Sequence, residues 1–117
     1  MAELYEALAE GLAGLVCPRS LVRRRCRRKL KVRSEDVELL AVDFLSRLLA
    51  LMQTEGFCVR DVKVTEAAEN NVAATLLGES LDTSRHQLGE EIKAVTYHML
   101  KVCRREGRWV GRVLLDL

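Results

Sequence analysis

The stretch that decides the fold is SEDVELLAVDFLSRLLALMQTEG, which occupies residues 34–56. Its apolar residues recur every three or four positions, the spacing that places side chains on one face of an α-helix. That face comprises Val37, Leu40, Ala41, Phe44, Leu48, Leu51 and Met52. Ser34 is a favourable N-terminal cap, and Gly56 stands where a left-handed C-terminal cap is expected. The sequence therefore predicts one long amphipathic helix that ends near Thr54.

The segment before this helix predicts a shorter helix and a strand. Residues 2–16 carry apolar side chains at helical spacing. Pro18 ends that helix, because a proline pushes the residue before it out of helical geometry. Residues 29–33, Lys-Leu-Lys-Val-Arg, alternate polar and apolar side chains as a half-buried strand does.

Beyond Gly56 the apolar residues alternate, which predicts strands. Two strands flank a turn at Asn70-Asn71. Residues 95–103 and 109–116 are apolar, β-rich runs, and the polar residues between them predict a hairpin with a longer loop. Two helices and about five strands indicate the α+β class. We expect a single domain over residues 1–117: a two-layer sandwich whose mainly antiparallel sheet is covered on one face by two helices.

The composition favours an intracellular globular protein. Hydrophobic residues make up 49% of the chain and charged residues 31%, which is the balance of a folded domain rather than a disordered one. No apolar run approaches the ~20 residues that span a membrane, and the acidic start is unlike a signal peptide. The four cysteines form no CxxC pair, so neither a zinc knuckle nor a thioredoxin motif is predicted. We expect reduced thiols, a cytoplasmic location with the nucleus as the alternative, and no membrane contact.

Positive charge is concentrated in residues 19–33, where no acid interrupts it. The cations are Arg19, Arg23, Arg24, Arg25, Arg27, Arg28, Lys29, Lys31 and Arg33, nine of the nineteen basic residues. Such a run suits RNA phosphates or an acidic protein partner, and a solvated surface segment is the plain alternative. It contains no aromatic residue, so base stacking is not predicted.

A second segment with chemical potential is Glu91-Ile92-Lys93-Ala94-Val95-Thr96-Tyr97-His98, at a predicted loop-to-strand junction. Lys93 is suited to contact a phosphate or a carboxylate, and His98 to carry a proton near neutral pH. The alternative is that Thr96 and His98 line one face of a strand and hydrogen-bond locally. A hydrolase built around His98 is a further hypothesis, but the sequence offers it no convincing nucleophile.

The sequence ends with an aspartate, Asp116, beside the terminal carboxylate of Leu117. Two such oxygen-rich groups attract a hard cation such as Ca²⁺ or Mg²⁺. They are too few to form a tight site alone, and a solvated chain end is the alternative interpretation.

These segments together resemble the archease family. The run from Glu91 to His98, Trp109 and the ending Val113-Leu114-Leu115-Asp116-Leu117 resemble the family's C-terminal signature. Gly78-Glu79 with Asp82, Arg85 and His86 resemble the loop that precedes it. Residues 34–57 resemble the family's central helix and the strand after it, and the resemblance weakens before residue 34.

The resemblance implies an accessory protein, not an enzyme. Archeases promote guanylylation and turnover of the RtcB-type RNA ligase that joins tRNA halves in splicing. The implied functional residue is Lys93, to which the chemistry above adds His98; Asp116 and Leu117 are implied ligands of a divalent cation, with Ca²⁺ expected. The family's third ligand is an aspartate in a His-Thr-Ala-Asp motif that this sequence lacks. We therefore expect an N-terminally shortened domain with an incomplete cation site.

Overall fold

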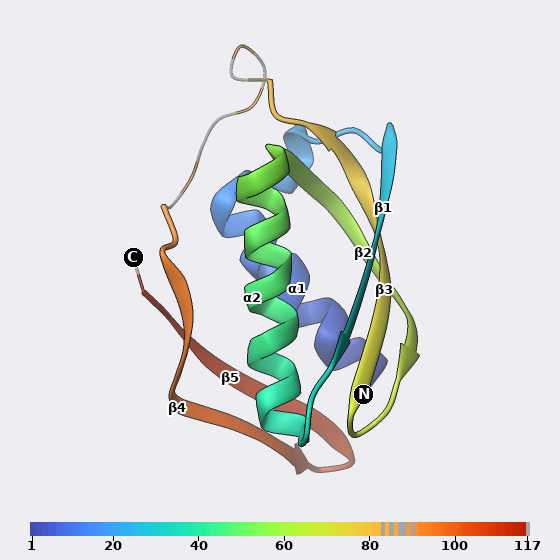
Figure 1. Cartoon of the computed structure of the whole chain (residues 1–117), viewed down its shortest axis with the longest axis vertical. Coiled ribbons are helices and arrows are strands. Elements are labelled where there is room, and N and C mark those ends of the chain that lie inside the picture. Colours follow the sequence, from blue (N-terminus) through green and yellow to red (C-terminus); the bar gives the residue numbers. More distant parts are fainter. Residues whose placement is uncertain (83, 85, 87–88, 90, 117) are drawn as a thin grey trace.

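A computed structural model of the chain describes residues 1–82, 84, 86, 89 and 91–116, and the side chains of residues 97–100 lie outside that description. Within it, two α-helices lie between a three-stranded and a two-stranded sheet, both antiparallel (Figure 1). The predicted α+β class is confirmed. The difference from the expectation is that the strands divide into two sheets, one on each side of the helices.

The long helix α2 (Val37–Glu55) explains this division. Besides the predicted apolar face, it buries Val42, Leu45 and Leu49. A helix that is apolar around much of its circumference needs cover on more than one side. The three-stranded sheet lies on one side of α2, and the hairpin of β4 (Ala94–Arg105) and β5 (Arg108–Asp116) lies on the other (Figure 1).

The ends of α2 are fixed by two caps, and one of them differs from the prediction. The N-terminal cap is Asp36, whose carboxylate accepts a 2.8 Å hydrogen bond from the Leu39 N–H. The prediction of Ser34 was wrong, because its hydroxyl instead donates to Asp43 Oδ2 at 2.9 Å. Gly56 ends the helix in the left-handed region, with φ 60° and ψ 45°, as predicted.

The first helix, α1 (Ala2–Val16), has the predicted bounds, and a short 3₁₀ turn, η1 (Arg19–Leu21), follows Pro18. Nowhere in the described part of the chain is a helix both long and apolar enough to cross a bilayer. The phenol ring of Tyr5 in α1 meets the ring of Phe44 in α2 edge to face, with centroids 5.5 Å apart. This pair lies at the centre of a core that draws residues from both helices and both sheets.

The larger sheet has the strand order β1-β3-β2, built from β1 (Cys26–Arg33), β2 (Phe57–Ala67) and β3 (Asn71–Ser80). β1 begins at Cys26, earlier than predicted; a turn between β2 and β3 is confirmed, at residues 68–70, with Asn71 as the first residue of β3. Gly78 is required where β3 passes β2, since a Cβ atom there would lie 1.9 Å from the Cys58 carbonyl oxygen.

The free edge of β2 is covered by α1. Glu10 accepts a hydrogen bond from the Val62 N–H at 3.2 Å, and Glu6, one turn earlier, accepts one from the Val64 N–H at 2.8 Å. An uncovered strand edge is a template for aggregation, so these two carboxylates protect the sheet as well as attach the helix to it.

The smaller sheet is a hairpin of β4 (Ala94–Arg105) and β5 (Arg108–Asp116). Its turn is only two residues long, Glu106 and Gly107, and both have positive φ angles, 50° and 78°. This is the backbone that two-residue hairpin turns prefer. The longer loop that the sequence predicted is therefore wrong, because the arginines on either side of this turn belong to the strands.

Candidate functional site

Lys93 and Asp116, two of the predicted functional residues, lie at the same end of the smaller sheet. The Lys93 N–H donates a 2.6 Å hydrogen bond to the Asp116 carbonyl oxygen, and Ala94 pairs with Asp116 in the β4–β5 register. Both side chains are exposed. We call this place, formed by Lys93, Ala94 and Asp116, the Lys93–Asp116 corner. It brings an ammonium and a carboxylate group to one exposed end of a sheet.

The corner is held against α2. The Gln53 side-chain amide donates to the Ile92 carbonyl oxygen at 2.8 Å, and the Ile92 side chain is buried in the core. A shallow hollow between α2 and β4 opens beside it. Its lining residues are Ser46, Leu49, Ala50, Gln53, Lys93, Ala94 and Val95. The backbone on which Lys93 stands is therefore fixed by two hydrogen bonds and a core residue, while its side chain faces solvent.

Two other predicted site residues lie outside what the structure describes. The backbone of His98 belongs to β4, but its side chain is among those not described, and Leu117 is not described at all. The roles expected of His98 and of the Leu117 carboxylate stay predictions.

The residues described here do not by themselves fit a resident Ca²⁺ ion. Across residues 1–82, 84, 86, 89 and 91–116, no three His, Cys, Asp or Glu side chains come together as a metal site would need. Asp116 offers one exposed carboxylate, whereas Ca²⁺ takes six to eight oxygen ligands.

The main buried polar cluster joins Glu79 to His86, and its importance was missed by sequence reasoning. Each residue is only 4% exposed. His86 Nδ1 accepts a hydrogen bond from the Asp82 N–H at 2.9 Å, so the neutral ring carries its proton on Nε2. Nε2 lies 3.0 Å from Glu79 Oε2, which also accepts a 2.6 Å hydrogen bond from the Arg23 N–H.

This cluster fixes the segment that leaves β3 against the segment that enters β1. The signal that could have revealed it is an acid directly after a glycine at the end of a predicted strand, followed by a histidine seven residues later. The sequence does not show that both side chains are buried, because the partner that completes the cluster is a backbone N–H 56 residues away.

Cys58 lies beside the same histidine, with its Sγ 3.8 Å from His86 Nδ1. A cysteine next to a histidine suggests a nucleophile and its base. Here the thiol is only 3% exposed and packs with Cys17 and Val22 in a small apolar cluster, which a substrate does not reach. Cys17 and Cys58 are therefore core residues.

Comparison with known proteins places the chain in a family. The sequence model of the Archease protein family (MTH1598/TM1083) matches residues 1–117. The chain belongs to the archease family. It is 39% identical to protein archease of Thermococcus gammatolerans and 34% identical to that of Pyrococcus abyssi, and each match covers 98% of this chain and 84% of the relative.

The fold agrees with this archease assignment. The solution structure of Methanobacterium thermoautotrophicum protein 1598 superposes with a TM-score of 0.77 at 29% identity, and the match covers 99% of this chain and 84% of that one. The resemblance drawn from the C-terminal segments is thus confirmed at the level of family and fold.

The basic segment of this archease is divided in two by its ion pairs. Arg19 lies 3.3 Å from Glu10 and 3.4 Å from Asp61, and Arg24 forms a short ion pair with the same aspartate. The hydrogen bond from Arg24 is the main cause that lowers the pKa of Asp61. Arg28 turns toward the end of α2 and the start of β2, where its guanidinium lies 4.9 Å from the centre of the Phe57 ring.

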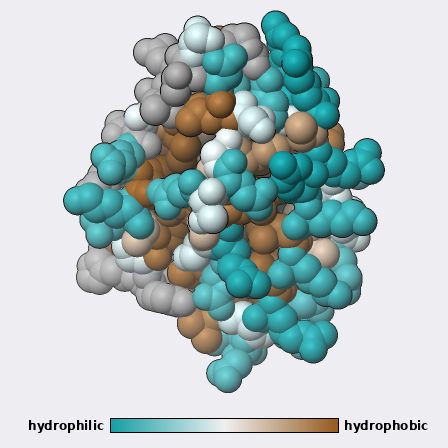
Figure 2. Space-filling model, turned by 45° about the horizontal axis from the view of Figure 1, so that its top comes forward, coloured by the Kyte–Doolittle hydropathy of each residue, from teal (hydrophilic) through white to brown (hydrophobic). Residues whose placement is uncertain are grey.

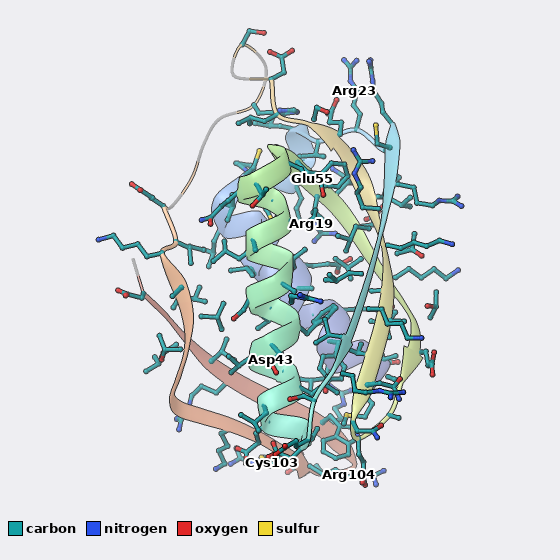
Figure 3. All side chains as sticks on the ribbon, viewed as in Figure 1. Arg19, Arg23, Asp43, Glu55, Cys103 and Arg104 are labelled. Carbon is teal, nitrogen blue, oxygen red and sulfur yellow. The ribbon has the colours of Figure 1, made fainter. Side chains whose placement is uncertain are left out.

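Arg28 also pairs at 2.9 Å with Glu55, which stands at the end of α2 (Figure 3). Its neighbours in β1 face the other way, so only part of the segment that looked uniformly basic is available to a partner.

Proposed function

We propose that this archease activates an RtcB-type RNA ligase in tRNA splicing by docking on it and promoting ligase guanylylation and turnover. Membership of the family supports the general role. The Lys93–Asp116 corner is the observation that supports assigning this role to particular residues. There the Lys93 N–H, just before β4, donates a hydrogen bond to the Asp116 carbonyl oxygen.

The corner suits the work of an activator because its backbone is rigid and its charges are exposed. A lysine ammonium is a compact partner for a phosphate or a carboxylate, and a carboxylate is a partner for a cation or an arginine. Held on paired strands, the two groups enter a partner's active site without first having to be ordered. We place His98 in the same functional group, because it belongs to β4, the strand that begins directly after Lys93.

The proposal assigns the chemistry to the ligase and not to this chain. Its support is the burial of the Cys58–His86 contact, which keeps the described thiol and imidazole away from substrates. A cytoplasmic location, with the nucleus as the alternative, belongs to the same proposal, and all four cysteines are free thiols.

A divalent cation, with Ca²⁺ expected, is a further part of the proposal. Asp116 would contribute one carboxylate, and other ligands would come from outside the described residues. Calorimetric titration of Ca²⁺ into the ligase–archease complex, with wild-type protein and with Asp116→Asn, tests this part. Equal binding by both proteins would remove Asp116 from the site.

The main experiment is multiple-turnover RNA ligation by an RtcB-type ligase with and without this chain. We expect stimulation by the wild type and its loss by roughly 10- to 100-fold in Lys93→Ala and Asp116→Asn, because a hydrogen bond to a charged group is worth about 1.5–3 kcal/mol. Lys101→Ala and Glu106→Gln are matched controls, since both residues are exposed in the same hairpin. Stimulation that is unchanged in both corner variants would contradict the assignment.

A further inference from the structure

The outer face of the larger sheet carries an ordered set of cations. In β1, burial alternates along the strand: Leu30 and Val32 point into the core, and the residues between and around them are exposed. We call the exposed set the cation row: Arg27, Lys29, Lys31 and Arg33. Figure 3 shows nitrogen-tipped side chains projecting from β1 away from α2, and Figure 2 shows hydrophilic side chains gathered on that side of the molecule.

The charges of the cation row are not neutralised within the described part of the chain. Arg19, Arg24, Arg25 and Arg28 have acidic partners there, and no ion pair involves the four residues of the row. Ion pairs within the described residues therefore account for four of the nine cations of the basic segment and leave the side chains of Arg23 and the cation row without an acidic partner there.

The neighbouring strand adds no negative charge to this face. The residues of β3 that pair with the row are, in order, Leu77, Thr75, Ala73 and Asn71, and all four are uncharged. Across Thr75, the outward residue of β2 is Lys63, a fifth cation. Two acids lie on the β2 side: Asp61, which is paired with Arg24, and Glu66 opposite Ala73.

The geometry of the row fits a regularly charged chain. Alternate residues of a strand are ~6.6 Å apart, so the four side chains stand at even steps over about 20 Å. Neighbouring phosphates of an extended nucleic-acid strand are separated by steps of similar size. Beside the row, the outward residues of β3 are small or polar apart from Leu77, which leaves room for the sugars and bases.

We propose that the outer face of the β1–β3–β2 sheet binds the phosphate backbone of single-stranded RNA through the cation row and Lys63, without regard to base sequence. The choice of RNA as the polyanion rests on the proposed function, in which the partner enzyme joins RNA. The outward side chains of β1 and β3 include no aromatic ring to stack on a base, so the contacts are to phosphates.

An acidic protein surface fits this face less well than RNA does. Stable protein interfaces are centred on aromatic or apolar anchors in desolvated pockets. The outward residues of β3 are small or polar apart from the half-buried Leu77. A row of separate cations beside such a face provides electrostatic attraction without an anchor, which is the form of non-specific nucleic-acid binding.

The test measures binding of a fluorescent single-stranded RNA by this chain alone, as anisotropy across a series of salt concentrations. The variant is the double change Arg27→Gln and Lys29→Gln. The control is Lys101→Gln with Arg104→Gln, which also removes one lysine and one arginine from exposed strand positions. For five phosphate contacts we expect log K to fall against log salt with a slope of about −3.5, and the variant, which lacks two of the cations, to lose about 1.4 of that slope.

The control double variant is expected to keep the wild-type slope. Both double variants are expected to have the same unfolding curve as the wild type. Equal slopes in variant and control would overturn the proposal. Competition by poly-glutamate that equals competition by unlabelled RNA would also overturn it. So would a variant that binds RNA normally and differs from the wild type only in self-association, because that result is expected if the cations only protect a strand edge. The binding assay contains no ligase, so a negative result in it does not contradict the proposed ligase activation. Equally, a failure to activate the ligase does not contradict RNA binding measured in this assay.

Discussion

Replacing Glu79 by alanine is expected to be among the most damaging single changes that leave the apolar core intact. The substitution removes the acceptor of two hydrogen bonds, one from the Arg23 N–H and one from His86 Nε2. The His86 donor then remains in a region that water does not freely enter, since His86 is only 4% exposed, whereas the Arg23 N–H is part-buried on an exposed residue. An unsatisfied buried donor retains the full cost of its lost hydration.

The magnitude follows from these two contacts. A hydrogen bond to a charged group contributes about 1.5–3 kcal/mol, so losing two lowers the free energy of unfolding by about 3–6 kcal/mol. A domain of ordinary stability has about 5–15 kcal/mol in total. Glu79→Gln keeps one acceptor oxygen in the same place and is expected to cost roughly half as much.

The assay is equilibrium unfolding in urea, followed by circular dichroism, with the free energy taken from linear extrapolation. Glu66→Ala is the matched control, because Glu66 is an exposed glutamate on the neighbouring strand and its loss is expected to change stability by no more than about 0.5 kcal/mol. If Glu79→Ala and Glu66→Ala unfold within about 1 kcal/mol of each other, the cluster does not hold the two segments as argued.

Three further predictions concern stability. Tyr5→Phe should raise the free energy of unfolding by about 1 kcal/mol in urea, because the buried hydroxyl, whose pKa burial raises to about 12, has no hydrogen-bond partner in the described part of the chain; a loss of stability would reveal a partner. Gly78→Ala should cost about 3 kcal/mol by thermal unfolding because its Cβ would strike the β2 backbone, whereas Gly11→Ala, where no described atom lies within 4 Å of the added Cβ, should gain about 0.5–1 kcal/mol; equal effects would contradict the close approach. Because the pKa of Asp61 is lowered from its ordinary value of 3.8, its bond to Arg24 stabilises the fold at pH values above 3.8. This stabilisation is lost as the pH falls through the pKa of Asp61 in the folded state. Asp61→Asn should therefore be less stable than wild type at pH 7 and approach it below pH 3.8, and a constant difference across a pH series would refute this.

Elements governed by local pattern were predictable from the sequence. The first helix has the predicted bounds because the apolar spacing of residues 2–16 and the following proline act within the segment itself. The left-handed Gly56 was predictable for the same reason. Ser34 and Asp36 are both good caps, and the choice between them is made by Asp43, which lies nearly two turns into the helix and binds the serine hydroxyl.

What the sequence could not predict depends on distant partners. The hairpin turn requires a left-handed Glu106, a conformation that glutamate rarely adopts alone, so a tight turn was not expected there. The Glu79–His86 cluster likewise depends on the fold bringing the Arg23 backbone near. For the candidate site, the contact of Lys93 with Asp116 follows from the register of the hairpin, which the sequence indicated only coarsely. The division of the basic segment was not predictable, because it depends on ion pairs with residues of separate strands and helices.

The hydrogen bonds from β2 to Glu6 and Glu10 of α1 provide a way to measure how often this helix detaches from the sheet. The amide hydrogens of Val62 and Val64 are held by side-chain carboxylates of a helix and not by a neighbouring strand. Their exchange with deuterated solvent therefore measures how often α1 detaches, independently of how often the sheet itself opens. Amide exchange at these two valines, compared with amides between β2 and β3, separates the detachment of one helix from global unfolding in a single spectrum.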